Sequence, residues 1–244
     1  MQIKTFKTHA IRPQDSLGEI LDSYLPRLEE RSIVAVTSKI ISLTEGRVVA
    51  KGEVASKQAL IRQSADGYLD VASPYGIEIT IKNNILIPSA GIDESNGDGY
   101  YILYPEDIQK SAAFIWNHLR ARHDVQELGI IITDSHTTPM RRGIIGIGLG
   151  WCGFSALYSY IGKPDCFNVP LKVSITNLLD SFAVAAVVCM GEGNEQTPLA
   201  VIKDAPKAVF QNRPPTQEEL QALQIPLEED LYAPLLANSR WVFT

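Results

Sequence analysis

The stretch "SIVAVTSKII", Ser32 to Ile41, combines the features of a buried strand and of a helix start. Ile33 to Val36 are apolar and mostly β-branched, which favours a strand. Thr37 and Ser38 follow, and both residue types are common immediately before a helix. We therefore predict a strand that leads directly into a short helix.

A β-hairpin is predicted downstream of this unit. Isoleucines at positions 77, 79 and 81 alternate with polar residues, and the alternation resumes at Ile85 and Ile87. Asn83 and Asn84 between them are typical of a tight turn. A further buried strand, "LGIIITD", is predicted to end at Asp134. In "GIIGIGLGWCG", period-two spacing predicts that Gly146, Gly148 and Gly150 share one bare face, which a ligand or another backbone can approach.

Helices are predicted where apolar residues recur at helical spacing. They begin near Leu17, at Pro105 and at Asn177. Ser16 with Glu19, and Thr216 with Glu219, have the spacing of a capping box. Because strands and helices alternate irregularly around at least one hairpin, we expect an α+β fold with a mixed sheet. After about Ala205 the chain becomes Pro-rich and polar, so residues 206–244 are expected to form a wrap-around tail.

Composition excludes several classes of function. The chain has 244 residues, 45% of them hydrophobic, which suffices for one large core or two interlocked lobes. A net charge of −6 without a basic block argues against a nucleic-acid partner. Without an apolar run of about 18 residues or an apolar signal region, we expect no membrane partner and a cytoplasmic location. The three cysteines are expected to be reduced core thiols.

Three acidic residues follow apolar elements that would fix their positions. Asp93, Asp134 and Glu192 each lie at the end of such an element, among small residues. Taken singly, each is more often a cap or a solvated turn residue. Taken together, carboxylates on rigid elements are what Mg²⁺ and Mn²⁺ require, because these cations bind few protein carboxylates and complete their shells with water and phosphate. A shared metal site is therefore one interpretation.

Two further segments are candidates for anion contacts. Thr37, Ser38 and Lys39 stand at a predicted strand-to-helix junction, where backbone N–H groups and a lysine suit phosphate, although an ordinary cap fits equally. Arg141 and Arg142 follow the Asp134 loop closely, and either an anion contact or plain surface charge would explain them.

Other familiar nucleotide and hydrolase motifs are excluded. Gly148, Gly150 and Gly153 match G-x-G-x-x-G, but no acid follows at the required distance of about 20 residues. No G-x-x-x-x-G-K-[ST] sequence is present, so a triphosphate site would not be a P-loop. Asp134 to His136 are consecutive and cannot face one another as a catalytic triad must.

Six motifs in order resemble the coenzyme F-420-0:L-glutamate ligase family, over roughly residues 1 to 205. They are "VTSKII" (Val36 to Ile41), "EGRVV" (Glu45 to Val49), "SAGIDESN" (Ser89 to Asn96), "YPED" (Tyr104 to Asp107), "IITDS" (Ile131 to Ser135) and "MGEGNEQTP" (Met190 to Pro198). The resemblance implies a two-lobed ligase domain over residues 1–205 that forms a homodimer. It also implies a GTP-dependent ligase that joins L-glutamate to a substrate carboxylate.

The resemblance also implies the site residues. A first Mg²⁺ or Mn²⁺ would bind Asp93 and Asp134, and a second would bind Ser135 and Glu192, with K⁺ as a further candidate cofactor. Asp93, Asp134 and Lys39 would carry catalysis by neutralising charge during phosphoryl transfer to the acceptor carboxylate. The nucleotide contacts would be Thr8, His9, Ala10, Ile11, Ser38, Lys39, Asn96, Met190, Gly191, Glu192, Gly193, Asn194, Glu195, Gln196 and Thr197.

The chain departs from many family members in one loop. They carry D-T-F-G-R-P-W-R where this chain has "DSHTTPMR", Asp134 to Arg141, so only the Asp, Pro139 and Arg141 persist. Leu43 also replaces a frequent Lys. The sequence of these motifs is more similar to a branch of the family suspected to glutamylate folates, so the expected acceptor is of deazaflavin or folate type. The changed loop also motivates an alternative, a nucleotide- and metal-binding protein without ligase activity.

Overall fold

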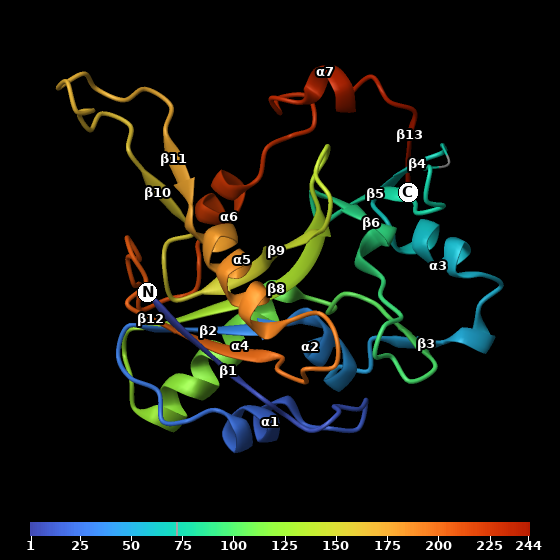
Figure 1. Cartoon of the computed structure of the whole chain (residues 1–244), viewed down its shortest axis with the longest axis horizontal. Coiled ribbons are helices and arrows are strands. Elements are labelled where there is room, and N and C mark those ends of the chain that lie inside the picture. Colours follow the sequence, from blue (N-terminus) through green and yellow to red (C-terminus); the bar gives the residue numbers. More distant parts are fainter. Residues whose placement is uncertain (72) are drawn as a thin grey trace.

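A five-stranded mixed sheet forms the centre of the computed structural model, which describes residues 1–71 and 73–244 (Figure 1). The strand order is β1-β12-β2-β8-β9. β2 and β8 are parallel, and the other neighbours are antiparallel. The predicted α+β class with a mixed sheet is thus confirmed. The strands are β1 (Gln2–Phe6), β2 (Ser32–Thr37), β8 (Leu128–Thr137), β9 (Ile144–Cys152) and β12 (Leu199–Lys203).

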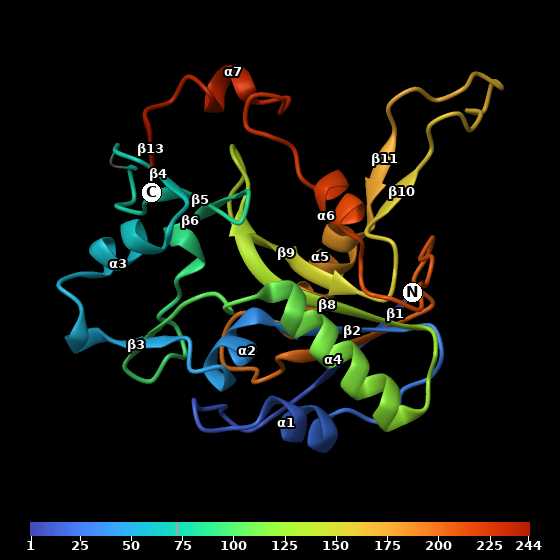
Figure 2. The ribbon, with the colours of Figure 1, turned by 180° about the vertical axis from the view of Figure 1, so that it is seen from behind.

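Helices cover both faces of this sheet (Figures 1 and 2). Successive strand residues point to opposite faces, so Val34 and Ile132 belong to a core with α1 and α4, whereas Ala35 and Ile131 belong to a core with α5. The expected strand-to-helix junction is confirmed, because α2 begins directly after β2. The helices are α1 (Leu17–Tyr24), α2 (Ser38–Thr44), α4 (Ile108–His123) and α5 (Leu178–Met190).

A second, antiparallel sheet has the order β13-β4-β5-β6. It contains the predicted hairpin, in which Asn83 and Asn84 take the left-handed conformation that a tight turn needs. Its strands are β4 (Gly67–Leu69), β5 (Ile79–Lys82), β6 (Ile85–Pro88) and β13 (Trp241–Phe243), and beside it lie α3 (Lys57–Ser64), the pair β3 (Val48–Ala50) and β7 (Tyr100–Ile102), and the 3₁₀ turns Lys51–Glu53 and Ser89–Gly91.

The C-terminal segment, residues 206–244, runs from one sheet to the other (Figure 1). Leu220 and Leu223 of α6 (Gln217–Leu223) pack against the core under α5. After α7 (Ala233–Leu236), β13 pairs with β4. The domain boundary at residue 205 remains a prediction. A separate ribbon, β10 (Leu157–Ser159) with β11 (Ile175–Asn177), projects from the body of the molecule (Figure 2).

The two capping-box predictions have different outcomes. Thr216 and Glu219 form the reciprocal bonds at α6, whereas Ser16 precedes α1 without a side-chain cap bond. The S/T-x-x-E spacing is necessary but not sufficient, because the side chain at the cap must also take the rotamer that reaches the N–H group. The prediction for Ser16 is therefore wrong.

The prediction of one bare glycine face is also wrong. A bulge between Ile132 and Thr133 shifts the register of β9. An added Cβ at Gly146 would lie 2.6 Å from the backbone oxygen of Ala183 in α5, but one at Gly150 would meet Ile108 of α4. Close approach by another backbone, one of the two options for this segment, is what occurs at Gly146.

The cysteine prediction holds only in part. Cys152 is buried, whereas Cys166 and Cys189 are exposed, so these two are not core thiols. Within the described residues, no helix has the length and hydropathy needed to cross a membrane.

Candidate functional site

A cavity of about 510 Å³ lies at the carboxyl end of β2, beside the last part of β8. Five chain segments line it, from the residues after β1 to the loop after α5. Every residue that the sequence assigned to nucleotide or metal lies on its wall: Thr8, His9, Ala10, Ile11, Ser38, Lys39, Asp93, Asn96, Asp134, Ser135, Met190, Gly191, Glu192, Gly193, Asn194, Glu195, Gln196 and Thr197. Thr37, a candidate anion contact, and Leu43, which replaces a frequent Lys, also lie on the wall. The wall further contains residues that the sequence did not single out, namely Ile40, Thr133, Val187 and Pro198.

The parallel pairing of β2 with β8 explains half of this convergence. Thr37, the last residue of β2, is the register partner of Thr133, whereas β8 continues to Thr137, beyond its predicted end at Asp134. Lys39, in the first turn of α2, and Asp134, the residue after Thr133 in β8, therefore lie on the same side of the cavity. In α/β sheets, ligands bind at such carboxyl ends of strands.

The loop after α5 forms the opposite wall. Gly191, with φ +80°, ends the helix and leaves room for the carboxylate of Glu195, whose Cδ would lie 2.5 Å from an added Cβ. The Glu195 carboxylate accepts a hydrogen bond from the Gly193 N–H at 2.8 Å. The N–H of Thr8 donates to the Gln196 carbonyl at 2.8 Å, which ties the loop to the chain after β1.

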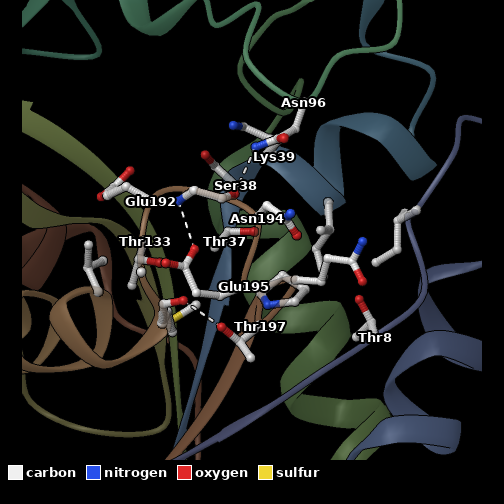
Figure 3. A pocket seen from close by; sticks show the side chains of 18 of the residues that line it. Thr8, Thr37, Ser38, Lys39, Asn96, Thr133, Glu192, Asn194, Glu195 and Thr197 are labelled. Carbon is white, nitrogen blue, oxygen red and sulfur yellow. Dashed lines mark hydrogen bonds between the residues drawn. The ribbon is translucent and has the colours of Figure 1, made fainter.

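The labelled polar side chains divide between two ends of the cavity. Lys39 and Asn96 lie together near one end, whereas Thr8 and Thr197 lie near the other (Figure 3). The Asn96 amide donates to the Gly193 carbonyl at 3.3 Å and so bridges the Asp93 loop to the loop after α5.

Lys39 and Asp93 form an ion pair on the wall. The ammonium Nζ lies 2.7 Å from Oδ2 of Asp93 and also donates to the carbonyl and the hydroxyl of Ser95 at 3.2 and 3.1 Å. Burial opposes ionisation of Asp93, but the Lys39 ammonium outweighs it and holds the pKa of Asp93 below its usual value. The Asp93 loop therefore presents several oxygens to a cation in this structure.

Asp134 has the opposite electrostatic setting. Desolvation raises the pKa of its carboxyl to about 6, although the Tyr104 hydroxyl, which donates to Oδ2 at 2.7 Å, acts in the other direction. Burial, and the negative charge of Asp134, raise the pKa of Tyr104 well above its usual value. A carboxylate that is costly to ionise in the folded protein is stabilised by any cation that enters the cavity.

The pKa of Glu192 is raised, like that of Asp134 and unlike that of Asp93. Desolvation raises the pKa of Glu192, and the charges of Asp93 and Glu195 add to the effect, while Lys39 opposes it. The cavity thus concentrates negative charge around one lysine.

The donor set fits a divalent cation of a particular kind. Within the described residues, no three His, Cys, Asp or Glu side chains come close enough to hold one metal ion. Mg²⁺ usually binds one or two carboxylates and takes its remaining oxygens from water and substrate phosphates. The ammonium of Lys39, held by three oxygens of the Asp93 loop, shows that this part of the wall accommodates a positive charge.

Sequence reasoning missed two residues with direct contacts at the site. Ser95 donates from Oγ to Asp93 at 2.9 Å, and Tyr104 contacts Asp134. Both lie within motifs that carried the family resemblance, which was the available signal. By contrast, Arg141 and Arg142 lie in the exposed turn after β8 and do not line the cavity.

Comparisons with known proteins show which family the chain is similar to. The family model described as F420-0:Gamma-glutamyl ligase matches residues 5–204. Among similar proteins are the coenzyme F420:L-glutamate ligases of Methanopyrus kandleri (29% identity; 79% of this chain and 82% of that protein), Haloarcula marismortui (31%; 80% and 83%) and Archaeoglobus fulgidus (29%; 83% and 88%).

The match to the family model covers all the segments that line the cavity. The chain is thus an enzyme of the ligase class. It belongs to the F420-0:gamma-glutamyl ligase family.

Proposed function

We propose that the protein uses GTP to join the amine of L-glutamate to a carboxylate of an acceptor. The observation that carries the proposal is the convergence of eighteen expected site residues, from five segments of the chain, on one cavity. The relatives in the family are named for glutamate ligation, which supports the same reaction here.

The chemistry proceeds through an acyl phosphate. A carboxylate is a poor electrophile, so an acceptor oxygen first attacks the terminal phosphorus of GTP, and GDP leaves. The glutamate amine then attacks the acyl carbon, phosphate leaves, and the amine loses a proton. Both steps demand positioning and charge neutralisation rather than a nucleophile from the protein.

The charged groups of the wall match those demands. Asp93 and Asp134 would hold one Mg²⁺ or Mn²⁺, and Ser135 and Glu192 a second. When bound, these cations supply positive charge that neutralises the phosphates. Lys39, which lies 2.7 Å from Asp93, is within reach of a phosphate beside such a cation.

Nucleotide binding would use the remaining wall. Ser38 and Asn96 lie beside the charged end, whereas Thr8 and Thr197 lie near the other end of the cavity (Figure 3). The wall also includes the apolar side chains of Ile11, Ile40 and Leu43. An apolar slot with a few polar groups is the usual setting for a nucleoside.

The acceptor is of deazaflavin or folate type. The printed names of the relatives favour a deazaflavin, whereas the loop Asp134 to Arg141 favours a folate. This segment runs from the cavity into the exposed turn between β8 and β9. A substrate that extends beyond the nucleotide site can contact it there.

A homodimer is part of the proposal. The projecting ribbon formed by β10 and β11 exposes several large apolar side chains, namely Ile161, Phe167, Val169, Val173 and Ile175. A two-stranded ribbon is only marginally stable on its own. Contact with a second copy of the chain would cover these side chains.

One assay tests the reaction. Purified protein is incubated with GTP, Mn²⁺, isotope-labelled glutamate and a panel of deazaflavin and folate acceptors, and the products are read by mass spectrometry. We expect one acceptor to gain the mass of a glutamyl residue as GDP forms. GTP binding without any labelled product would instead support the alternative, a nucleotide-binding protein without ligase activity, which the changed loop motivates.

A further inference from the structure

We propose that Tyr104 is a positioning residue that fixes the Asp93 loop and the Asp134 carboxylate relative to each other for cation binding. The inference rests on the proposed function, because it assigns a role within the proposed cation site. It concerns a residue that does not line the cavity.

The first contact joins Tyr104 to Asp134. The Tyr104 hydroxyl donates to Oδ2 of Asp134 at 2.7 Å. Its ring is 5% exposed and belongs to the same core as Ile108 and Ile132. Because close packing fixes the ring, the hydroxyl has little freedom and holds the Asp134 carboxylate in one orientation.

The second contact joins the strand that precedes Tyr104 to Asp93. The N–H of Asp93 donates to the carbonyl of Ile102 at 3.0 Å, and the N–H of Ile102 donates to the carbonyl of Asp93 at 2.8 Å. Ile102 ends β7, two residues before Tyr104. The backbone of Asp93 is therefore fixed to the strand that places the tyrosine.

A third contact limits the Asp93 loop directly. An added Cβ at Gly91 would lie 2.2 Å from Cζ of Tyr104, so the ring occupies the space that a side chain would need. Gly91 also has φ +70°, which favours glycine. The ring thus packs against the loop two residues before Asp93, while its hydroxyl holds Asp134.

Tyr104 is itself anchored independently of the cavity. Its carbonyl accepts a hydrogen bond from Nε of Arg47 at 3.2 Å, and the N–H of Leu103 donates to the Arg47 carbonyl at 3.0 Å. One anchored side chain therefore touches both parts of the proposed cation site. Groups that orient metal ligands in this way affect metal affinity about 10- to 100-fold.

The experiment compares Mn²⁺ binding by wild-type protein and by Tyr104→Phe, using electron paramagnetic resonance of free Mn²⁺ with GDP present. The phenylalanine ring retains the contact with Gly91 and loses only the hydrogen bond to Asp134. We expect Mn²⁺ to bind about 10- to 100-fold more weakly. In turnover assays at saturating Mn²⁺, kcat should fall while KM for GTP stays within about twofold, because the hydroxyl orients the cation site and not the nucleoside.

Ser111→Ala is the matched control. Ser111 is also a buried hydroxyl that donates to a carboxylate, Oε1 of Glu45, at 2.5 Å, but it lies on α4 and does not line the cavity. Both variants should lower the melting temperature by similar amounts, since each loses one buried hydrogen bond. Only Tyr104→Phe should change Mn²⁺ affinity.

The outcomes separate this inference from the proposed function. If Tyr104→Phe binds Mn²⁺ within twofold of the wild type, or if Ser111→Ala weakens binding equally, Tyr104 has no positioning role. A wild-type protein that binds no Mn²⁺ overturns the inference too. If the wild type binds Mn²⁺ but makes no glutamyl product, the proposed ligation fails while the role of Tyr104 in cation binding stands.

Discussion

Asp93 and Asp134 line the same cavity, yet the protein holds them in opposite ways. Asp93 lies in a loop with an ammonium on its carboxylate, and the pKa of Asp93 is lowered. Asp134 lies on a strand of the central sheet, where burial raises its pKa to about 6. The difference shows that the Asp93 carboxylate is stabilised as an anion before any ligand arrives. The Asp134 carboxyl ionises at little cost only when a cation is beside it.

The largest expected effect comes from removing the ionised member of the pair. Asp93→Asn keeps the shape but removes the charge, so cation binding and GTP turnover should fall by more than the roughly 100-fold that loss of an orienting partner costs. GDP release in the presence of Mn²⁺ measures this effect. Asp98→Asn, an exposed change in the same loop, should retain wild-type turnover. Retained turnover in Asp93→Asn would remove Asp93 from the site.

A smaller effect is expected from removing the ammonium. Lys39→Met should lower kcat by about 10²-fold, as the loss of one preorganised donor does elsewhere. It should also raise the pKa of Asp93, because the lysine is what lowers it. Steady-state kinetics and a carboxyl ¹³C NMR titration of metal-free protein measure the two effects. Lys203→Met, which removes an exposed ion pair with Glu29, is the control and should change neither.

The raised pKa of Asp134 predicts a dependence of stability on pH in metal-free protein. Ionised Asp134 is disfavoured in the folded state, so its contribution to stability is full below the unfolded pKa of about 4 and is lost as pH rises through the folded pKa of about 6. A shift of roughly two units corresponds to about 3 kcal/mol, which partial exposure reduces to about 2 kcal/mol.

Urea unfolding with a chelator present measures this contribution. The stability of the wild type relative to Asp134→Asn should fall by about 2 kcal/mol between pH 4 and pH 6, and stay constant above about pH 7. A difference that does not change with pH would mean that burial does not perturb Asp134. Added Mn²⁺ should restore wild-type stability at neutral pH and leave Asp134→Asn unaffected, if Asp134 binds the cation.

Sequence predicted the elements that carry these residues better than the contacts between them. The strand before Lys39, the hairpin and α5 follow from local periodicity, which packing preserves. The meeting of β2 and β8 at one edge depends on their being neighbours in the sheet, which periodicity does not state. The family resemblance predicted that their residues share one site, because six motifs in order are evidence for a shared fold.

What sequence missed depends on tertiary packing. Tyr104 reads as an ordinary residue before Pro105, and only the structure places its hydroxyl on Asp134. The face of Gly150 was predicted wrongly because a bulge between Gly148 and Gly150, opposite Ile132 and Thr133 of β8, changes the register. In both cases the decisive neighbour lies far away in the sequence, so no local pattern reports it.

The smallest expected effect tests how much the Ser95 hydroxyl, in the same loop as Asp93, contributes to cation binding by Asp93. Ser95→Ala removes the hydroxyl that donates to Asp93 at 2.9 Å, but keeps the Ser95 N–H bond to the same carboxylate and the carbonyl that accepts from Lys39. The change also removes the bond that the hydroxyl accepts from Lys39 at 3.1 Å. Because only the bond to Asp93 touches the proposed ligand, a loss of about 1 kcal/mol should weaken Mn²⁺ binding about fivefold. Isothermal titration calorimetry measures this change, with Ser181→Ala on α5 as the control. A loss as large as that of Asp93→Asn would mean that the Ser95 hydroxyl, and not the ammonium of Lys39, chiefly sets the state of Asp93.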